Sequence, residues 1–219
     1  KMSQELHQLP AGWEWLALNK VVEKTANLNP SQKPDSTWDY IDISSIDRDK
    51  LLITEPKKVL GKEAPSRAKK QIKVGDVIFA TTRPNLKNIA AIKKEYELAV
   101  ASTGFSVLRA SNKLDSKYIF YFVTTDFLQQ QIEPFISGAS YPAITDTNLK
   151  KAFIPLPALA EQQRLVKKLD TLFSRINTAI EHLEHSLELN DQLFASSLNQ
   201  AFNPLNAETQ ADGTYQLPD

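Results

Sequence analysis

Residues 158–202 read ALAEQQRLVKKLDTLFSRINTAIEHLEHSLELNDQLFASSLNQAF and contain neither glycine nor proline. Mostly apolar side chains recur there at alternating steps of three and four residues over five heptads, which is the pattern of a coiled-coil seam. The helix is predicted to end at Phe202, because Pro204 disfavours helical geometry at Asn203. The seam positions that we expect to face a partner helix are Val166, Leu169, Phe173, Ile176, Ile180, Leu183, Leu187, Asn190 and Phe194, and Ser197 and Ala201 continue the pattern.

A helix of this length requires a partner. At about 1.5 Å per residue it spans roughly 65 Å, which is too long for a domain of about 150 residues to cover. Asn190 on the seam is the kind of polar residue that fixes register in a coiled coil. The alternative is a long helix that folds back on its own domain.

The residues before Pro157 show a different pattern, with short β-like runs bounded by turn residues. One helical segment interrupts them, starting at the expected cap Ser116 and running to Ile132. The predicted strands are WDYIDI at 38–43, DVIFATT at 76–82, NIAAIK at 88–93 and GFSVLRA at 104–110. The predicted fold class is therefore α+β: a mixed α/β globular domain over residues 1–157, a long helix over 158–202 and a connecting tail over 203–219.

Composition narrows the class of protein. The 219 residues include 42% hydrophobic ones, enough for a globular core, and no cysteine, so disulfides and thiolate zinc sites are excluded. The sequence has no run of 18 apolar residues and no charged-then-apolar leader. We therefore expect a cytoplasmic protein without a membrane span.

The charges balance overall but are unevenly distributed. The chain carries 26 basic and 26 acidic residues, yet the stretch from Arg48 to Lys94 has 13 Lys or Arg against four Asp or Glu, which leaves +9. Such a basic block is typical of a protein that binds a polyanion, because neutralising phosphates releases counterions. The alternative is a solvated lysine face. The candidate phosphate ligands in the block are Lys57, Lys58, Lys69, Lys70 and Lys73.

Three features bear on catalysis. Pro34 and Asp35, followed by Glu55 and Lys57, match a loose acid-and-lysine pattern of metal-dependent nucleases, although Pro56 interrupts the supposed strand. Two histidines three residues apart, at 182 and 185, are compatible with metal ligation but flank the helical seam. The six glycines form no nucleotide-binding loop. We expect no catalysis, no cofactor and no metal; the alternative is a metal-dependent nuclease with a helical dimerisation arm.

Four stretches together resemble the specificity subunits of type I restriction-modification systems. They are LPAGWEW at 9–15, GDVIFATTRPNLKNIA at 75–90, SGASYPAITDTNLKKAFIPLP at 137–157 and FIPLPALAEQQRLVKKLDTLFSRI at 153–176. The resemblance implies a non-catalytic subunit that recognises a DNA sequence within a multi-subunit restriction and methylation complex. A further alternative is the recognition part of a fused restriction-methylation enzyme, for which the same DNA contacts and helix pairing are expected.

In that family, two recognition domains, each followed by a helix, form a head-to-tail repeat. The resemblance implies that each domain reads half of a split double-stranded DNA target and that the helices pair antiparallel and dock methyltransferase subunits, with restriction subunits joining through the complex. QLP recurs at 8–10 and within YQLPD at 215–219. We therefore expect the first domain and helix of such a repeat, and a homodimer through the long helix where the second repeat is missing.

Two loops are predicted to contact DNA. In Thr81–Lys87, Arg83 suits a guanine edge, Asn85 an adenine edge and Lys87 a phosphate. In Ser137–Pro142, Ser140 and Tyr141 lie on a glycine-containing turn. The alternative is that Arg83 and Tyr141 brace the domain, and the less family-like stretch Lys57–Lys73 is a further candidate for reading bases.

Overall fold

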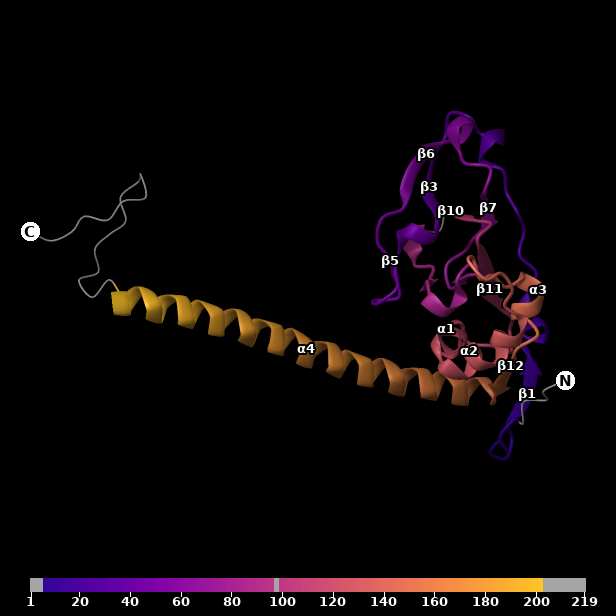
Figure 1. Ribbon diagram of the computed structural model, residues 1–219. Coiled ribbons are helices and arrows are strands. Elements are labelled where there is room, and N and C mark those ends of the chain that lie inside the picture. Colours follow the sequence, from indigo (N-terminus) through magenta and orange to yellow (C-terminus); the bar gives the residue numbers. More distant parts are fainter. Residues whose placement is uncertain (1–5, 97–98, 203–219) are drawn as a thin grey trace, which may run out of the picture. The chain divides into compact units, whose positions relative to one another are not determined.

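The computed structural model describes residues 6–96 and 99–202. By its internal contacts the chain divides into two compact units, Lys1–Val166 and Lys167–Asp219. The first unit holds the strands and short helices, and the second holds most of the long helix (Figure 1). The α+β fold class predicted from the sequence is confirmed, whereas the division at residues 157, 202 and 219 stays a prediction.

The strands of the first unit are short. They are β1 (Glu14–Ala17), β2 (Val22–Glu23), β3 (Thr37–Ile41), β4 (Ile46–Asp47), β5 (Leu52–Ile53), β6 (Lys57–Leu60), β7 (Ala68–Gln71), β8 (Val77–Ala80), β9 (Ile89–Ala91), β10 (Val100–Ser102), β11 (Phe105–Ala110) and β12 (Phe153–Leu156). The α-helices are α1 (Ser116–Thr124), α2 (Asp126–Ile132), α3 (Asp146–Leu149) and α4 (Leu159–Phe202). The four strands predicted from the sequence correspond to β3, β8, β9 and β11.

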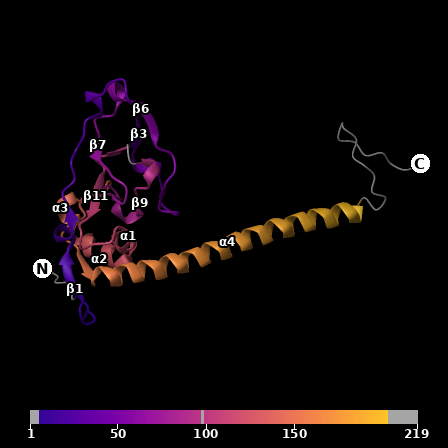
Figure 2. The same cartoon turned by 180° about the vertical axis from the view of Figure 1, so that it is seen from behind.

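Two four-stranded sheets organise the domain. The central sheet has the order β2-β11-β8-β9 and is antiparallel. The distal sheet has the order β6-β3-β10-β7, with a parallel pair between β3 and β10. Figures 1 and 2 show α1 and α2 at one end of the domain and β3, β6 and β7 at the other. The central sheet therefore has helices on one side and the distal sheet on the other.

The residues of β8 explain why the central sheet is covered on both faces. Val77 and Phe79 lie in a cluster with buried residues of α1 and α2, while Ile78 and Ala80 lie in a second cluster that includes Ile41 of β3. All four residues of β8 are buried. A strand buried on both faces reads as a continuous apolar run, here VIFA, rather than as an alternation.

The helix predicted from Ser116 to Ile132 is two helices, so that part of the prediction was wrong. Thr125 has extended backbone angles and caps α2, because its hydroxyl accepts from the Leu128 N–H at 3.2 Å. The cap of α1 is Asp115 rather than Ser116, since the Asp115 carboxylate accepts from two N–H groups of the first turn. Competition from a side-chain cap breaks an otherwise helical apolar pattern.

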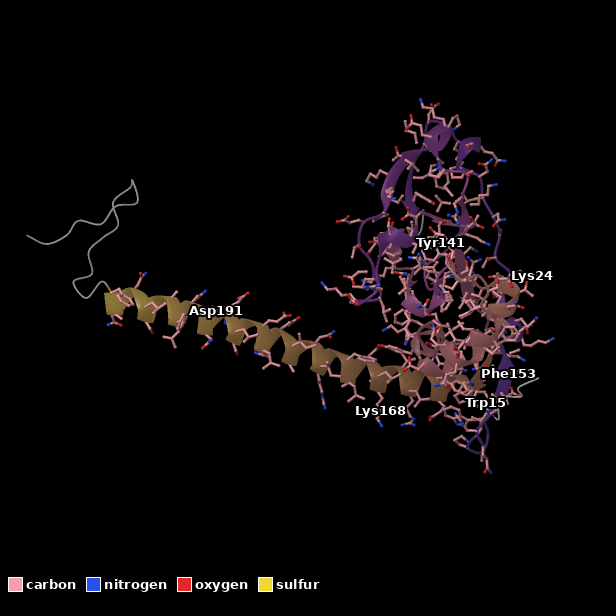
Figure 3. All side chains as sticks on the ribbon, viewed as in Figure 1. Trp15, Lys24, Tyr141, Phe153, Lys168 and Asp191 are labelled. Carbon is pink, nitrogen blue, oxygen red and sulfur yellow. The ribbon has the colours of Figure 1, made fainter. Side chains whose placement is uncertain are left out.

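The long helix α4 extends from Leu159 to Phe202, as the heptad pattern predicts. In unit 2 its apolar residues are exposed: Phe173, Ile176, Ile180, Leu183 and Leu187 keep between 47% and 66% of their surface. Side chains project from all sides of the helix between Lys168 and Asp191 (Figure 3). Over the part of the chain that the structure describes, no helix is long and apolar enough to cross a membrane.

The first turns of α4 belong to the domain. Gln162 is fully buried and Val166 is 7% exposed. Val166 was predicted to face a partner helix and instead lies among the domain's buried residues, because the seam begins while the helix still packs against the domain. The predicted tail, with its YQLPD repeat, lies outside the described residues.

Candidate nucleic-acid interface

The structure brings together the two loops that the sequence predicts to contact DNA. The Arg83 N–H donates to the Pro142 carbonyl at 2.6 Å, and the Ile144 N–H donates to the Thr81 carbonyl at 2.9 Å. A β-bridge joins Thr82 to Ala143. Thr81–Lys87 and Ser137–Pro142 are thus one surface, and we call their residues together the loop pair.

The backbone of the first loop adopts a rare conformation at two residues. Arg83 and Lys87 have φ angles of 50° and 51° and flank a 3-10 turn at Pro84–Leu86. Left-handed angles are uncommon outside glycine and are maintained only where the surrounding structure determines them. The hydrogen bonds of the loop pair supply that restraint at Arg83, so its side chain starts from a defined position.

The second loop requires its glycine. Gly138 has φ of 96°, and a Cβ there would lie 2.6 Å from the Tyr141 carbonyl oxygen. The Ser137 and Ala143 backbones exchange hydrogen bonds of 2.8 and 2.9 Å across the base of this loop. The SGASYP turn is therefore closed and holds Ser140 and Tyr141 at its tip.

The side chains of the loop pair are available to a ligand. Arg83, Asn85 and Ser140 are exposed, and Tyr141 keeps 72% of its surface. The Arg83 guanidinium carbon lies 5.3 Å from the centroid of the Tyr141 ring, within cation-π range. This cation-π contact supports the bracing role for Arg83 and Tyr141. It also leaves both side chains exposed to solvent.

Lys87 has a partner within the protein. Its ammonium group lies 2.7 Å from the Asp126 carboxylate, at the first residue of α2. This ion pair ties the end of the loop to the helical part of the domain. A phosphate contact by Lys87 would have to compete with Asp126.

A polar network fixes the chain just after the second loop. The Asp146 carboxylate, on α3, accepts hydrogen bonds from the Ser106 hydroxyl and from the Lys150 ammonium group. Burial alone would raise the pKa of Asp146, but these hydrogen bonds and the positive charges of Lys150 and Lys70 hold it below its usual value. The charged form of Asp146 therefore stabilises the base of the loop pair.

The basic block is divided between the two edges of the distal sheet. Lys57 and Lys58 lie on edge strand β6, paired with Asp42 at 2.7 Å and Asp39 at 2.9 Å. Lys69 and Lys70 lie on β7, the opposite edge, and Lys73 follows them. The predicted phosphate ligands therefore do not form one continuous patch.

The nuclease alternative receives no support. Lys57 contacts Asp42 and Ser44 rather than the predicted acids Asp35 and Glu55, which are exposed. Among the described residues, no group of three His, Cys, Asp or Glu side chains is placed to hold a metal ion. The same holds for the two histidines of α4, of which His185 lies 3.9 Å from Glu188.

Sequence reasoning missed two glutamines that hold the domain together. Gln131 donates to the Phe153 carbonyl and accepts from the Phe153 N–H, as a neighbouring strand would. Gln162 accepts from the Asp115 N–H and donates to two carbonyls, those of Lys113 and Pro157. A polar residue on the apolar face of a helix was the available signal in each case.

A pocket built from four separate segments of the distal sheet was also missed, because its residues are far apart in sequence.

Comparison with known proteins identifies the family. Residues 10–189 match the family described as the type I restriction modification DNA specificity domain. The chain is 21% identical over 212 residues to the type I restriction enzyme EcoDI specificity subunit of Escherichia coli, which covers 96% of this chain and 46% of that protein.

Two solved structures are similar over nearly the whole chain. The HsdS subunit of Thermoanaerobacter tengcongensis is 38% identical with a TM-score of 0.80, over 91% of this chain and 51% of that one. A chain from a structure on complex assembly and conformational transition of the type I R-M system is 37% identical with a TM-score of 0.76, over 97% of this chain and 53% of that one. The chain thus spans about half the length of these relatives. On the strength of a match that covers most of its residues, the chain belongs to the family of type I restriction modification DNA specificity domains.

Proposed function

We propose that this chain is a non-catalytic DNA-recognition unit that reads one half of a split double-stranded target within a type I restriction-modification complex. The observation that carries the proposal is the loop pair, in which two segments distant in sequence are hydrogen-bonded together. Membership of the DNA specificity family also supports the proposal.

The chemistry of the loop pair suits base edges. A guanidinium group can donate two hydrogen bonds to O6 and N7 of guanine, and a carboxamide can pair with N6 and N7 of adenine. Arg83 and Asn85 supply these groups from an exposed turn. The Tyr141 ring, held beside Arg83, adds a flat surface for backbone or base contact.

In this proposal, α4 is the spacer and the partner surface. Its exposed seam is expected to pair antiparallel with the helix of a second repeat, or with a second copy of this chain, and to dock methyltransferase subunits. Restriction subunits would join through that complex, in the cytoplasm. The recognition domain corresponds to residues 1–157, the spacer to 158–202 and the connection to the next repeat to 203–219.

The salt dependence of duplex binding tests the proposal. The logarithm of the affinity should fall with the logarithm of the salt concentration, by about 0.9 for each phosphate neutralised. Lys69→Ala with Lys70→Ala should flatten this slope, because the two changes remove two positive charges from edge strand β7. Lys20→Ala with Lys24→Ala is the matched control and should change the slope less, since both lysines are exposed but lie outside the basic block.

A cleavage assay tests the absence of catalysis. The purified chain should shift a duplex in a gel and leave a supercoiled plasmid intact in the presence of Mg²⁺. Magnesium-dependent nicking that Asp35→Ala abolishes would overturn the proposal in favour of a nuclease. Duplex affinity that does not respond to salt would overturn it independently.

A further inference from the structure

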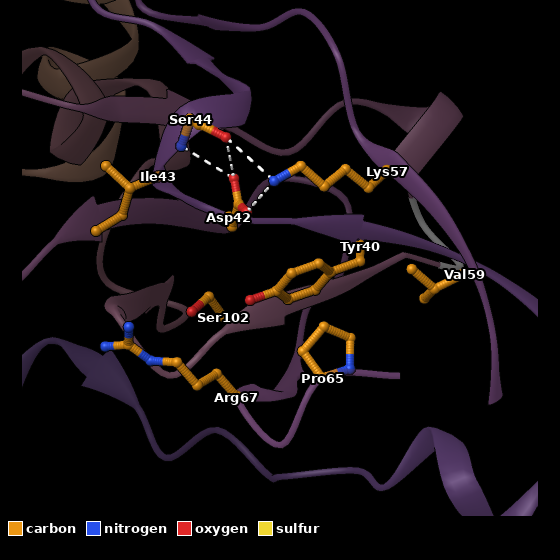
Figure 4. A pocket seen from close by; sticks show the side chains of 9 residues that line it. All are labelled: Tyr40, Asp42, Ile43, Ser44, Lys57, Val59, Pro65, Arg67 and Ser102. Carbon is orange, nitrogen blue, oxygen red and sulfur yellow. Dashed lines mark hydrogen bonds and ion pairs between the residues drawn. The ribbon is translucent and has the colours of Figure 1, made fainter. Parts of the chain in front are cut away.

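The distal sheet contains a pocket that the loop pair does not use. It has a volume of about 390 Å³ and is lined by residues of β3 and the turn after it, of β6, of the turn before β7 and of β10. These residues are Tyr40, Asp42, Ile43, Ser44, Lys57, Val59, Pro65, Arg67 and Ser102 (Figure 4).

On one wall of the pocket, the charged groups already have hydrogen-bond partners. The Asp42 carboxylate accepts from the Lys57 ammonium group at 2.7 Å, from the Ser44 hydroxyl at 2.6 Å and from the Ser44 N–H at 3.0 Å. Partial burial would raise the pKa of Asp42, but these hydrogen bonds keep it below its usual value. The Asp42–Lys57 pair is therefore neutral as a unit, and both oxygens of the only carboxylate in the lining are occupied.

The other wall carries unused donors. Tyr40 is 5% exposed, and its hydroxyl has no hydrogen-bond partner among the residues that the structure describes. Figure 4 shows this hydroxyl directed toward Ser102. The Ser102 oxygen accepts from the Gly104 N–H at 3.1 Å, which leaves its own proton to donate. The Tyr40 hydroxyl is not among the buried polar atoms that lack a partner, so it reaches the open pocket, where it can donate to an occupant that accepts hydrogen bonds.

Arg67 gives the pocket its charge. The side chain is exposed, and within residues 6–96 and 99–202 its guanidinium group makes no ion pair. Because Asp42 and Lys57 neutralise each other, the net charge of the lining is the single positive charge of Arg67. A guanidinium group, a phenol and a serine hydroxyl together suit a ligand that is anionic and rich in acceptors.

The pocket is tied to the loop pair through one turn. The Thr103 N–H donates to the Arg67 carbonyl at 2.8 Å. One residue on, the Gly104 carbonyl accepts from both the N–H and the hydroxyl of Thr81, at 2.8 and 2.9 Å. The turn between β10 and β11 therefore links Arg67 to the first residue of the loop pair.

We infer that this pocket binds a phosphate group of the DNA backbone, held by the Arg67 guanidinium and the Tyr40 and Ser102 hydroxyls, beside the bases that the loop pair reads. The inference rests on the proposed function. It adds an anchor built from a guanidinium group and two hydroxyls rather than from lysines, one that fixes register on the duplex and carries no sequence preference of its own.

Two variants test the anchor in the full chain. Tyr40→Phe removes only the unpaired hydroxyl, so the thermal stability should be unchanged while the affinity for a fluorescent 30-base-pair duplex falls about 10-fold. Arg67→Ala should lower the affinity by a similar factor for every sequence and reduce the log-log salt slope by about 0.9. The matched control is Lys24→Ala, which removes one exposed positive charge outside the pocket and should change the slope less.

Each other outcome overturns the inference. If wild-type chain binds no duplex, both the proposed function and the pocket inference fail. If wild type binds with the expected salt slope and both variants bind equally well, only the pocket inference fails. A loss confined to one base position would make Arg67 a base-reading residue, and a loss of inorganic phosphate binding with unchanged duplex affinity would indicate a free phosphate compound as the occupant.

Discussion

The guanidinium group of Arg83 lies over the ring of Tyr141, 5.3 Å from its centroid, and the Arg83 N–H donates to the carbonyl of the next residue, Pro142. The side chain that suits a guanine edge is thus held by the loop that faces it. Bracing and reading are compatible in this geometry, because neither side chain is buried.

Substitution of this pair should separate specificity from stability. Arg83→Ala should relax the preference at one base position by about 1–3 kcal/mol, the usual discrimination from a bidentate contact. Tyr141→Phe retains the ring and should leave the preference unchanged, so it serves as the control. Competition binding with single-base variants of the selected duplex measures both effects. An unchanged preference in Arg83→Ala would assign Arg83 to bracing alone.

Gln162 should be a stability residue of the domain. Gln162→Ala removes the partners of the Asp115 N–H and of two carbonyls in a fully buried position, so the free energy of unfolding should fall by about 1–3 kcal/mol. The exposed neighbour Gln163 provides the control, since Gln163→Ala should change stability by less than about 0.5 kcal/mol. Urea unfolding of the two variants measures the difference; equal stability would contradict this assignment.

Asp146 should make stability depend on pH. Its pKa is lower in the folded protein than its ordinary value of 3.8, so its contribution is fully present well above 3.8 and is lost as the pH falls through the lower folded value. Asp146→Asn removes the charge and should lower the free energy of unfolding at pH 7 by about 1 kcal/mol. The loss is modest because the side chain is half exposed and solvent screens its charge. The difference from wild type should shrink toward pH 3. Asp49→Asn, at an exposed carboxylate, should show no such convergence, and a constant Asp146→Asn difference would count against the network.

The seam of α4 should drive association. Burying one Leu or Phe is worth about 1.5–3 kcal/mol, and several are exposed on one face of the helix. The chain should therefore sediment as a dimer, and Ile180→Asp with Leu187→Asp should give a folded monomer. Thr178→Asp with His185→Asp has the same spacing on another face and should remain dimeric. A wild-type chain that stays monomeric at high concentration would contradict the spacer role.

Sequence reasoning predicted the elements with strong periodicity and missed those fixed by tertiary contacts. The long helix and strands β8 and β11 follow from repeated apolar residues. Strand β12 contains Pro155, which cannot donate to a ladder, and it pairs with β1 across more than a hundred residues. The break at Thr125 depends on one side-chain hydrogen bond that competes with the helix.

The candidate site divides in the same way. The TTRPNLK and SGASYP loops could be chosen from turn chemistry, but their pairing through Pro142 depends on the folded sheet. The charge of the basic block was readable, whereas its separation onto β6 and β7 follows from a strand order that local sequence does not encode. Tyr40, Arg67 and Ser102 carried no individual signal, because they meet only when β3, β7 and β10 become neighbours.

Selection of duplexes from a random pool tests the central claim most directly. The purified chain should enrich one short motif, and as a dimer through α4 it should enrich two inverted copies of that motif at a fixed spacing. Repeating the selection with Ile180→Asp and Leu187→Asp should keep the half-site and lose the fixed spacing. A pool that shows no enrichment, although the chain binds duplex DNA, would contradict sequence recognition by this domain.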